Sequence, residues 1–238
     1  MKNLVILSGA GMSAESSIST FRDAGGLWDK YPVEQVATPE GYARNPELVI
    51  NFYNERRKQL LDVVPNAGHL GVADLERDFN VTVVTQNVDN LHERAGSTHV
   101  IHLHGELTKV CSSRDPYNPH FVKELAPEEY EVKLGDKAGD GTQLRPFIVW
   151  FGESVPEIET AIRYVEQADI FVIIGTSLNV YPAAGLLNYV PRAAEVYLID
   201  PKPVDTHVMR PIHVIQKGAS EGVKELKALL TVTQPPLP

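Results

Sequence analysis

Four short runs of apolar residues, each ending in glycine or a polar turn, constrain the fold more than any other feature of this sequence. They lie at residues 4–7, 81–84, 170–174 and 196–199. Short runs that are apolar at nearly every position are typical of parallel strands that are buried on both faces of a sheet. Segments with helical periodicity lie at 66–79, 157–167, 182–190 and 219–230. The pattern predicts an α/β fold, a doubly wound parallel sheet of the Rossmann-like type with helices on both faces.

Two stretches interrupt this alternation and predict a second, smaller inserted module. Residues 27–65 have a helical pattern and no core strand, whereas residues 111–145 are polar and rich in glycine, proline and charge. We therefore expect one domain over 1–238, with a Rossmann-like core formed by 1–26, 66–110 and 146–232. Residues 27–65 and 111–145 would form the small module.

Composition excludes several classes of protein. The chain has 238 residues, of which 43% are hydrophobic and 22% charged, and no apolar run is long enough to cross a membrane. A net charge of −9 argues against direct binding of nucleic acid, which needs clustered lysine and arginine. The single cysteine, Cys111, excludes an internal disulfide. We expect a cytoplasmic protein, monomeric and without membrane contact.

A glycine-rich turn follows the first predicted strand. Residues 9–14 read Gly-Ala-Gly-Met-Ser-Ala and match the turn in which glycines let the backbone approach a pyrophosphate. The alternative is a tight strand-to-helix turn that merely packs. A dehydrogenase would also need a second strand that ends in an acidic residue about 20 residues later. Here a polar loop with Phe21, Arg22 and Trp28 follows instead, which argues against a dehydrogenase.

Polar side chains also follow the other predicted strands. Gln86-Asn87-Val88-Asp89, Gly175-Thr176-Ser177 and Asp200 each stand just beyond a strand, and the carboxyl ends of parallel strands meet at the edge where such sheets bind ligands. For residues 86–89 the alternative is a turn that caps a helix starting near Asn90. The convergence at one edge favours a ligand site.

Two histidines lie close together at His102 and His104, and an extended backbone would place both on one face. Three interpretations remain open from the spacing alone. They are a structural histidine, a general base with a pKa near neutrality, and a metal pair, although no third ligand stands nearby in the sequence.

Taken together, these motifs resemble those of the sirtuins, a family of NAD-dependent protein deacylases. The resemblance runs from residues 9–16 through Phe21-Arg22, 86–89, His104-Gly105 and 175–177 to Ala219. It implies that His104 is the catalytic base and that Asn87 takes part in catalysis. The residues that it implies for NAD are Gly9, Ala10, Gly11, Ser13, Ala14, Glu15, Thr20, Phe21, Arg22, Trp28, Gln86, Asn87, Asp89, Gly175, Thr176, Ser177, Asp200 and Ala219.

The resemblance also implies a reaction and a substrate. The amide oxygen of an acylated lysine attacks the nicotinamide ribose, nicotinamide leaves, and the acyl group ends on ADP-ribose after His104 deprotonates a ribose hydroxyl. The acylated protein or peptide adds as a strand beside Phe151-Gly152 and Val180-Tyr181. The alternative is an NAD hydrolase or an ADP-ribosyltransferase that uses the same pocket.

Tyr53 and Arg56 lie three residues apart and share one face of a predicted helix. The pair resembles the Tyr-x-x-Arg signature of the desuccinylase branch of sirtuins (class III, CobB-type bacterial). It implies a guanidinium and a phenol that bind the carboxylate of a succinyl or malonyl group. Without the resemblance, Arg56, Arg57 and Lys58 would read as a solvated basic helix.

The sequence departs from the family at its structural zinc. Sirtuins usually hold zinc with two Cys-x-x-Cys pairs, but this chain has only Cys111. Ligation by Cys111 and His120 lacks support from the spacing, so we expect no zinc. Ser17 also stands where a glycine is common. The small module is expected to have a substitute core of Phe121, Val122, Leu125, Tyr130, Val132 and Leu134.

Overall fold

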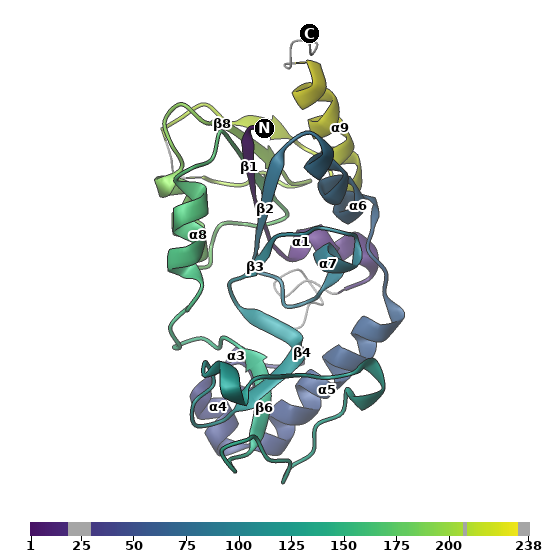
Figure 1. Cartoon of the computed structure of the whole chain (residues 1–238), viewed down its shortest axis with the longest axis vertical. Helices are drawn as coiled ribbons and strands as arrows, with labels where there is room; N and C mark the ends of the chain where they lie inside the picture. The colour runs from purple at the N-terminus through teal and green to yellow at the C-terminus, as the bar shows by residue number, and fades with distance from the viewer. Residues whose placement is uncertain (19–29, 207–208, 233–238) are drawn as a thin grey trace.

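The computed structural model describes residues 1–18, 30–206 and 209–232. A six-stranded parallel sheet forms the larger part, and a three-stranded antiparallel sheet with three helices forms the smaller part below it in Figure 1. The strand order in the large sheet is β3-β2-β1-β7-β8-β9. Its strands are β1 (Asn3–Ser8), β2 (Asn80–Thr85), β3 (Val100–His102), β7 (Ile170–Ile174), β8 (Glu195–Ile199) and β9 (His213–Ile215).

The apolar strands form the large sheet because both of its faces are covered. Leu4 and Ile6 of β1 belong to one buried cluster, whereas Val5 and Leu7 belong to another, as the alternation of a strand requires. Helices α6 (Ala67–Asp74) and α9 (Ala219–Val232), with the 3₁₀ turn η2 (Leu75–Arg77), pack on the first face. The second face carries α8 (Ile158–Val165) and η5 (Ala183–Tyr189), and Figure 1 shows α8 and α9 on opposite sides. The predicted doubly wound α/β fold is confirmed.

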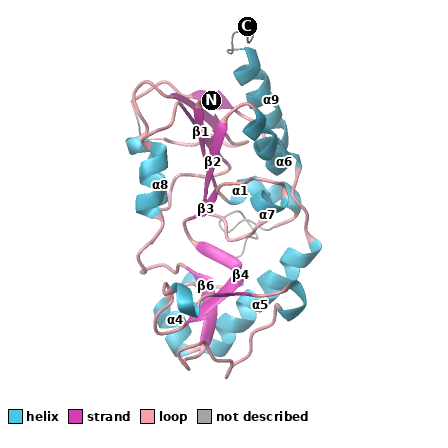
Figure 2. Ribbon diagram, in the orientation of Figure 1, coloured by secondary structure: helices cyan, strands magenta, loops and turns pink. Residues whose placement is uncertain are grey.

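The small module combines helices from one part of the chain with strands from another, as the colours of Figure 1 show. Figure 2 shows these helices and strands together in the lower part of the view. Its longest helix begins at Pro46, where the side chain of Asn45 accepts a hydrogen bond from the amide of Leu48, a typical helix start. The helices are α3 (Val33–Val36), α4 (Pro39–Arg44) and α5 (Pro46–Asp62). The strands and 3₁₀ turns are β4 (Gly105–Ser112), η3 (Pro119–Phe121), β5 (Lys123–Glu124), η4 (Pro127–Glu129) and β6 (Leu144–Ile148).

Several predicted boundaries differ from the structure. Residues 105–110 and 146–148, which we expected in the Rossmann-like core, pair with each other in β4 and β6 of the small sheet. The predicted helix at 182–190 is the 3₁₀ helix η5, and β3 and β9 had no counterpart among the predicted strands. None of the helices in the described ranges is long and apolar enough to cross a membrane.

The expected substitute core of the small module is partly wrong. Val132 is buried and packs with Ile50 and Val110, and Leu125 packs against this cluster. Leu134, however, is 56% exposed. Phe121, Val122 and Tyr130 are only half-buried. The module therefore derives its apolar contacts from α5 and β4 as much as from the loop itself.

A hydrogen-bonded cluster, Ser112, Asp140 and Thr142, joins the end of β4 to the loop before β6. The hydroxyl of Ser112 donates to Asp140 over 2.7 Å, and the hydroxyl of Thr142 donates to the same carboxylate over 2.6 Å. The amides of Arg114 and Asp115 donate to Ser112 Oγ, each over 3.0 Å. The hydrogen bond from Thr142, followed by that from Ser112, lowers the pKa of Asp140 to about 2. The carboxylate is therefore ionised over the physiological range and ties the loop to the sheet.

Candidate active site

The carboxyl ends of four neighbouring strands bring the predicted ligand residues together. Gly9 follows β1, Gln86 follows β2, Gly175 follows β7 and Asp200 follows β8, and these strands are adjacent in the sheet. Gln86 Nε2 donates to Thr176 Oγ1 over 2.9 Å, which links two of these loops directly. The predicted convergence at one edge is therefore confirmed.

The glycines of the first loop pack against the loop after β7. The amide of Gly9 donates to the carbonyl of Ile174 over 3.0 Å, and that of Gly11 donates to Gly175 over 2.9 Å. A Cβ on Gly11 would lie 2.7 Å from Gly175 Cα, and Gly175 itself has a φ of +61°. The close packing of the two segments therefore explains by itself why glycine stands at these positions. The turn brings backbone to backbone at the edge where a ligand would bind.

Ser13 is the centre of a buried hydrogen-bond network under this edge. Its hydroxyl donates to Asp89 Oδ2 over 2.9 Å and accepts from Asn87 Nδ2 over 3.1 Å. His69 Nε2 lies 3.4 Å from the same hydroxyl. Asp89 Oδ1 also accepts from the amide of Leu91 over 3.1 Å, and Leu91 is the first residue of a short helix. This oxygen therefore does what the alternative interpretation of residues 86–89, a turn at the start of a helix, predicts. Burial, opposed by the bonds from Leu91 and Ser13, raises the pKa of Asp89.

A second buried histidine, His92, extends the network, and neither His92 nor His69 was predicted from the sequence. His92 Nε2 lies 3.0 Å from Ser8 Oγ, and Ser8 donates to Thr85 Oγ1 over 2.8 Å. The rings of His69 and His92 meet edge to face at 4.9 Å. Burial lowers the pKa of His69 to about 4 and that of His92 well below its ordinary value, so both are neutral. One signal was available for His69: Asn66 three residues earlier forms a capping box with it.

His104 has the geometry of a general base. Its Nδ1 lies 3.0 Å from the carbonyl oxygen of Gln86, which only accepts hydrogen bonds, so Nδ1 carries the proton and Nε2 keeps its lone pair. Burial, partly opposed by the Gln86 carbonyl, lowers the pKa of His104 below its ordinary value. The ring is therefore neutral near pH 7 and can take a proton at Nε2.

Tyr53 and Arg56 lie on α5 with contrasting partners. Trp150 Nε1 donates to the hydroxyl of Tyr53 over 3.1 Å, which leaves the phenolic proton free to donate elsewhere. Arg56 stacks on Phe52 at 5.2 Å, and its Nη2 lies 3.6 Å from Glu55. Within residues 1–18, 30–206 and 209–232, its Nε and Nη1 are buried without a hydrogen-bond partner. A solvated basic helix would not leave a guanidinium in that state.

The remaining predicted residues have diverse surroundings. The carboxylate of Glu15 accepts from the amide of Ser220 over 3.1 Å, which fastens the first loop to α9. Ala219 and Thr176 are buried, whereas Ala14, Ser177, Phe151, Gly152 and Tyr181 are exposed and Ala10, Val180 and Asp200 are half-buried. Four of the predicted residues lie outside the described residues, namely Thr20, Phe21, Arg22 and Trp28.

Comparison with known proteins agrees with this geometry. The Sir2 family pattern matches residues 9–182. The chain belongs to the Sir2 family. It is 84% identical to an NAD-dependent protein deacylase of Bacteroides thetaiotaomicron over 97% of this chain and 98% of that protein. It is accordingly an enzyme, an NAD-dependent protein deacylase of the sirtuin type.

Two solved structures of relatives have the same fold. A Sir2 homologue in complex with NAD superposes with a TM-score of 0.83 at 38% identity, over 97% of this chain and 90% of that one. A mutant Sir2 homologue in complex with 2′-O-acetyl-ADP-ribose superposes with a TM-score of 0.85 at 37% identity, over 100% and 95% of the two chains.

Proposed function

We propose that this enzyme removes acyl groups from lysine side chains of proteins or peptides and prefers acidic acyl groups such as succinyl and malonyl. Nicotinamide and O-acyl-ADP-ribose are the products, as the relative bound to 2′-O-acetyl-ADP-ribose supports. The observation that carries the acidic preference is the guanidinium of Arg56, whose Nε and Nη1 are buried and have no hydrogen-bond partner among the described residues.

The residues at the carboxyl edge of the sheet fit NAD as the co-substrate. Buried donors and acceptors converge there from loops 86–89 and 175–177 and from the short helices after β1, α1 (Ala10–Ser13) and η1 (Ala14–Ser16). Asn87 and Asp89 are only 5% and 7% exposed. NAD supplies a ribose whose bond to nicotinamide breaks and whose hydroxyl receives the acyl group. In this proposal the described cofactor residues named above hold its two halves.

His104 and the network around Ser13 divide the chemistry between them. His104 Nε2 takes the proton of a ribose hydroxyl, because its Nδ1 is occupied by the carbonyl of Gln86. Asn87 and Asp89 are held by Ser13 and orient the ribose. Loss of deacylation in His104→Ala, with the earlier nicotinamide-releasing step retained as exchange of labelled nicotinamide into NAD, tests the first of these roles.

The acyl pocket recognises a carboxylate through two donors on α5. Arg56 offers the N–H groups of Nε and Nη1, and Tyr53 offers its hydroxyl proton because the oxygen already accepts from Trp150. The ion pair of Arg56 Nη2 with Glu55 leaves Nε and Nη1 without acceptors, and an acyl carboxylate satisfies them with charge-assisted hydrogen bonds. An acetyl group cannot do so.

The experiment is to measure kcat/KM for matched succinyl-lysine and acetyl-lysine peptides in the parent enzyme, in Arg56→Met and in Lys58→Met. Lys58 is exposed on the same helix, so its variant controls for the lost charge. Removing the bonds to an ionised group costs about 2–3 kcal/mol, so Arg56→Met should lose roughly thirtyfold to hundredfold on the succinyl peptide alone. Equal losses on both peptides would refute the acidic preference. Nicotinamide release that needs no peptide would favour the NAD hydrolase.

The small module does not fit a family-type zinc site. Cys111 is the only cysteine of the chain, and its buried Sγ lies 3.7 Å from the carbonyl oxygen of Pro146. Burial raises the pKa of the Cys111 thiol to about 12, which disfavours the thiolate that zinc needs. We infer that the Ser112–Asp140–Thr142 cluster closes the module without zinc. The monomeric state, the cytoplasmic location and the lack of nucleic-acid binding stay predictions.

A further inference from the structure

One segment holds the main chain of the loop that carries Asn87. Four consecutive carbonyl groups, those of residues 85–88, each accept a hydrogen bond from residues 102–107. The bonds are Leu103 N to Thr85 O at 2.9 Å, His104 Nδ1 to Gln86 O at 3.0 Å, His102 Nδ1 to Asn87 O at 3.0 Å, and Leu107 N to Val88 O at 2.7 Å. Two of the four donors are main-chain amides. The other two are the rings of His102 and His104.

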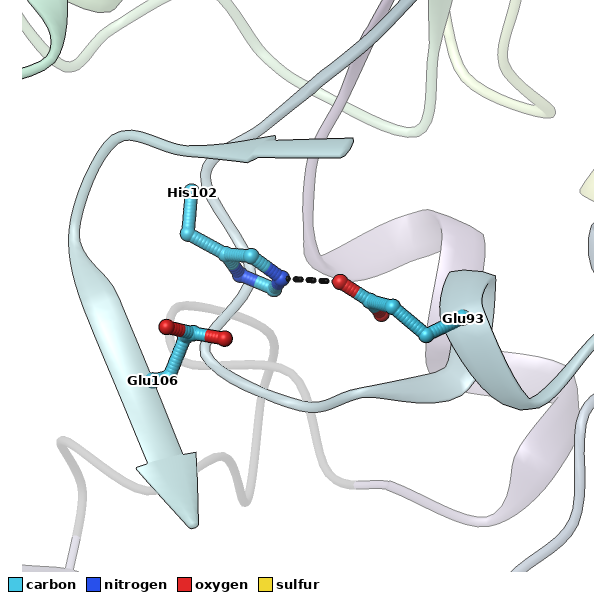
Figure 3. A group of neighbouring side chains, drawn as sticks. All are labelled: Glu93, His102 and Glu106. Carbon is cyan, nitrogen blue, oxygen red and sulfur yellow. Dashed lines mark hydrogen bonds and ion pairs between the residues drawn. The ribbon is translucent and has the colours of Figure 1, made fainter. Parts of the chain in front are cut away.

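His102 differs from His104 at its second nitrogen. Its Nε2 lies 2.7 Å from Glu93 Oε1, while its Nδ1 lies 3.0 Å from the carbonyl oxygen of Asn87. Figure 3 shows the contact between the ring and the carboxylate from α7 (Leu91–Arg94). Carbonyl and carboxylate oxygens only accept, so the ring must donate from both nitrogens and is therefore an imidazolium. Its side chain is 8% exposed, which shields the two bonds from competing water.

The charges around His102 favour that ionised state. Burial by itself lowers the pKa of His102, but the bond and charge of Glu93, the charge of Glu106 and the carbonyl of Asn87 together raise it above 6.5. The ammonium of Lys109 pairs with Glu106. The other titratable groups that interact with His102 are Asp89 and His92, and the ring of His92 is neutral.

This cluster is an ion-pair network. Ligand atoms of Glu93, His102 and Glu106 all lie within 4.8 Å of one another (Figure 3), a spacing that could also hold a metal. However, an imidazolium has no lone pair for a metal, and Glu106 already has Lys109 as its counter-ion. The cluster therefore holds a proton between Glu93 and the loop.

We propose that His102 is a positioning residue for deacylation, acting as an imidazolium clamp that fixes the Asn87 carbonyl to Glu93 of α7. The clamp holds the main chain from which the side chain of Asn87 reaches Ser13 over 3.1 Å. The inference rests on the proposed role of Asn87. It does not depend on the acyl preference.

Two near-isosteric variants separate the two bonds of the ring. His102→Asn keeps a donor close to the position of Nδ1, and His102→Gln keeps one close to that of Nε2. His99→Asn is the matched control, because His99 precedes the same strand and its ring packs on Tyr164 at 4.8 Å, away from the loop. The readouts are kcat and KM as functions of pH, with the acyl peptide that the parent enzyme turns over fastest.

Parent activity should rise with pH as His104 becomes neutral. It should fall again as pH rises through the raised pKa of His102, because the proton that remains on the neutral ring stays on Nε2 beside the Glu93 carboxylate and the bond to the Asn87 carbonyl is lost. His102→Asn should keep kcat within about threefold and lose the alkaline fall. His102→Gln should lose about tenfold in kcat, the worth of one hydrogen bond, with KM unchanged. Glu93→Gln should move the alkaline fall to lower pH, which keeps the inference testable if a His102 variant does not fold.

Equal kcat values in the two His102 variants, with the alkaline fall unchanged, would show a merely structural role and refute the inference. Full kcat in Asn87→Ala would instead refute the proposed role of Asn87, and the clamp with it. If Asn87→Ala loses activity but His102→Asn and His102→Gln have equal kcat values, the clamp alone is refuted and the role of Asn87 stands.

Discussion

Mild acid should destabilise this enzyme through the buried pair His69 and His92. His69 is 0% exposed. Its Nδ1 accepts from the amide of Asn66 over 3.3 Å, and its Nε2 faces Ser13 Oγ at 3.4 Å. A second proton on the ring would remove the acceptor of the Asn66 amide and place a charge in the core beside Ser13, which contacts Asn87 and Asp89. The folded state therefore resists protonation, while the unfolded chain does not.

The sign and size follow from the two pKa values. Burial lowers the pKa of His69 from 6.5 to about 4 in the folded chain. Well above pH 6.5 neither state holds the proton, so this contribution to stability is constant. Below it the unfolded state binds the proton first and stability falls, by about 1 kcal/mol at pH 5.5 and by roughly 3 kcal/mol once the pH is below 4. His92 acts in the same direction, because its pKa is also lowered by burial.

The assay is urea unfolding at intervals between pH 7.5 and 5.5, comparing the parent enzyme with His69→Gln. The variant should be less stable at pH 7.5, but its stability should fall by about 1 kcal/mol less over this interval. His120→Gln is the control, since His120 is exposed on η3 and its loss should leave the slope unchanged. If His69→Gln and the parent lose stability in parallel, His69 is not the group that resists protonation.

Two further predictions concern the departures from the family. Asp140→Ala removes the carboxylate that accepts from Ser112 and Thr142 and should lower the melting temperature of the enzyme. Excess chelator should leave the melting temperature of the parent enzyme unchanged, and a fall with chelator would mean that a metal supports the fold. Ser17 has a left-handed backbone with φ 64°, so Ser17→Gly should stabilise the enzyme by a few tenths to about 1 kcal/mol in urea unfolding, and a loss of stability would refute the strain.

The large sheet could be predicted because its strands carry their own signal. A strand such as β7 is apolar at every position since both faces are buried, and the turns after β1 and β7 need glycine where the two loops touch. The small sheet has no such signal. Its strand β4 pairs with β6 far along the chain, and its residues alternate weakly, so the sequence does not show that the module begins at Gly105.

The buried polar network could not be predicted from the sequence for a different reason. Ser8, Thr85 and His92 contact one another only because β1, β2 and α7 meet in three dimensions. Each residue is unremarkable in its own segment of the sequence. Polar groups that satisfy one another across elements leave no periodic pattern, and so their burial could not be predicted from spacing.

The structure brings the rings of His102 and His104 to the same loop, although the backbone is not extended as the sequence pattern assumed. An extended segment would have placed His102 and His104 on one face, but β3 ends at His102 and the chain turns before β4. Both rings nevertheless face the same loop, because the carbonyls of Gln86 and Asn87 accept from both Nδ1 atoms. What separates the two residues is the other nitrogen. Glu93 faces that of His102 and raises its pKa, whereas burial lowers the pKa of His104. In the proposed division of roles, one ring is charged and holds the loop while the other is neutral and can accept a proton, and Glu93 and Glu106 together set this difference.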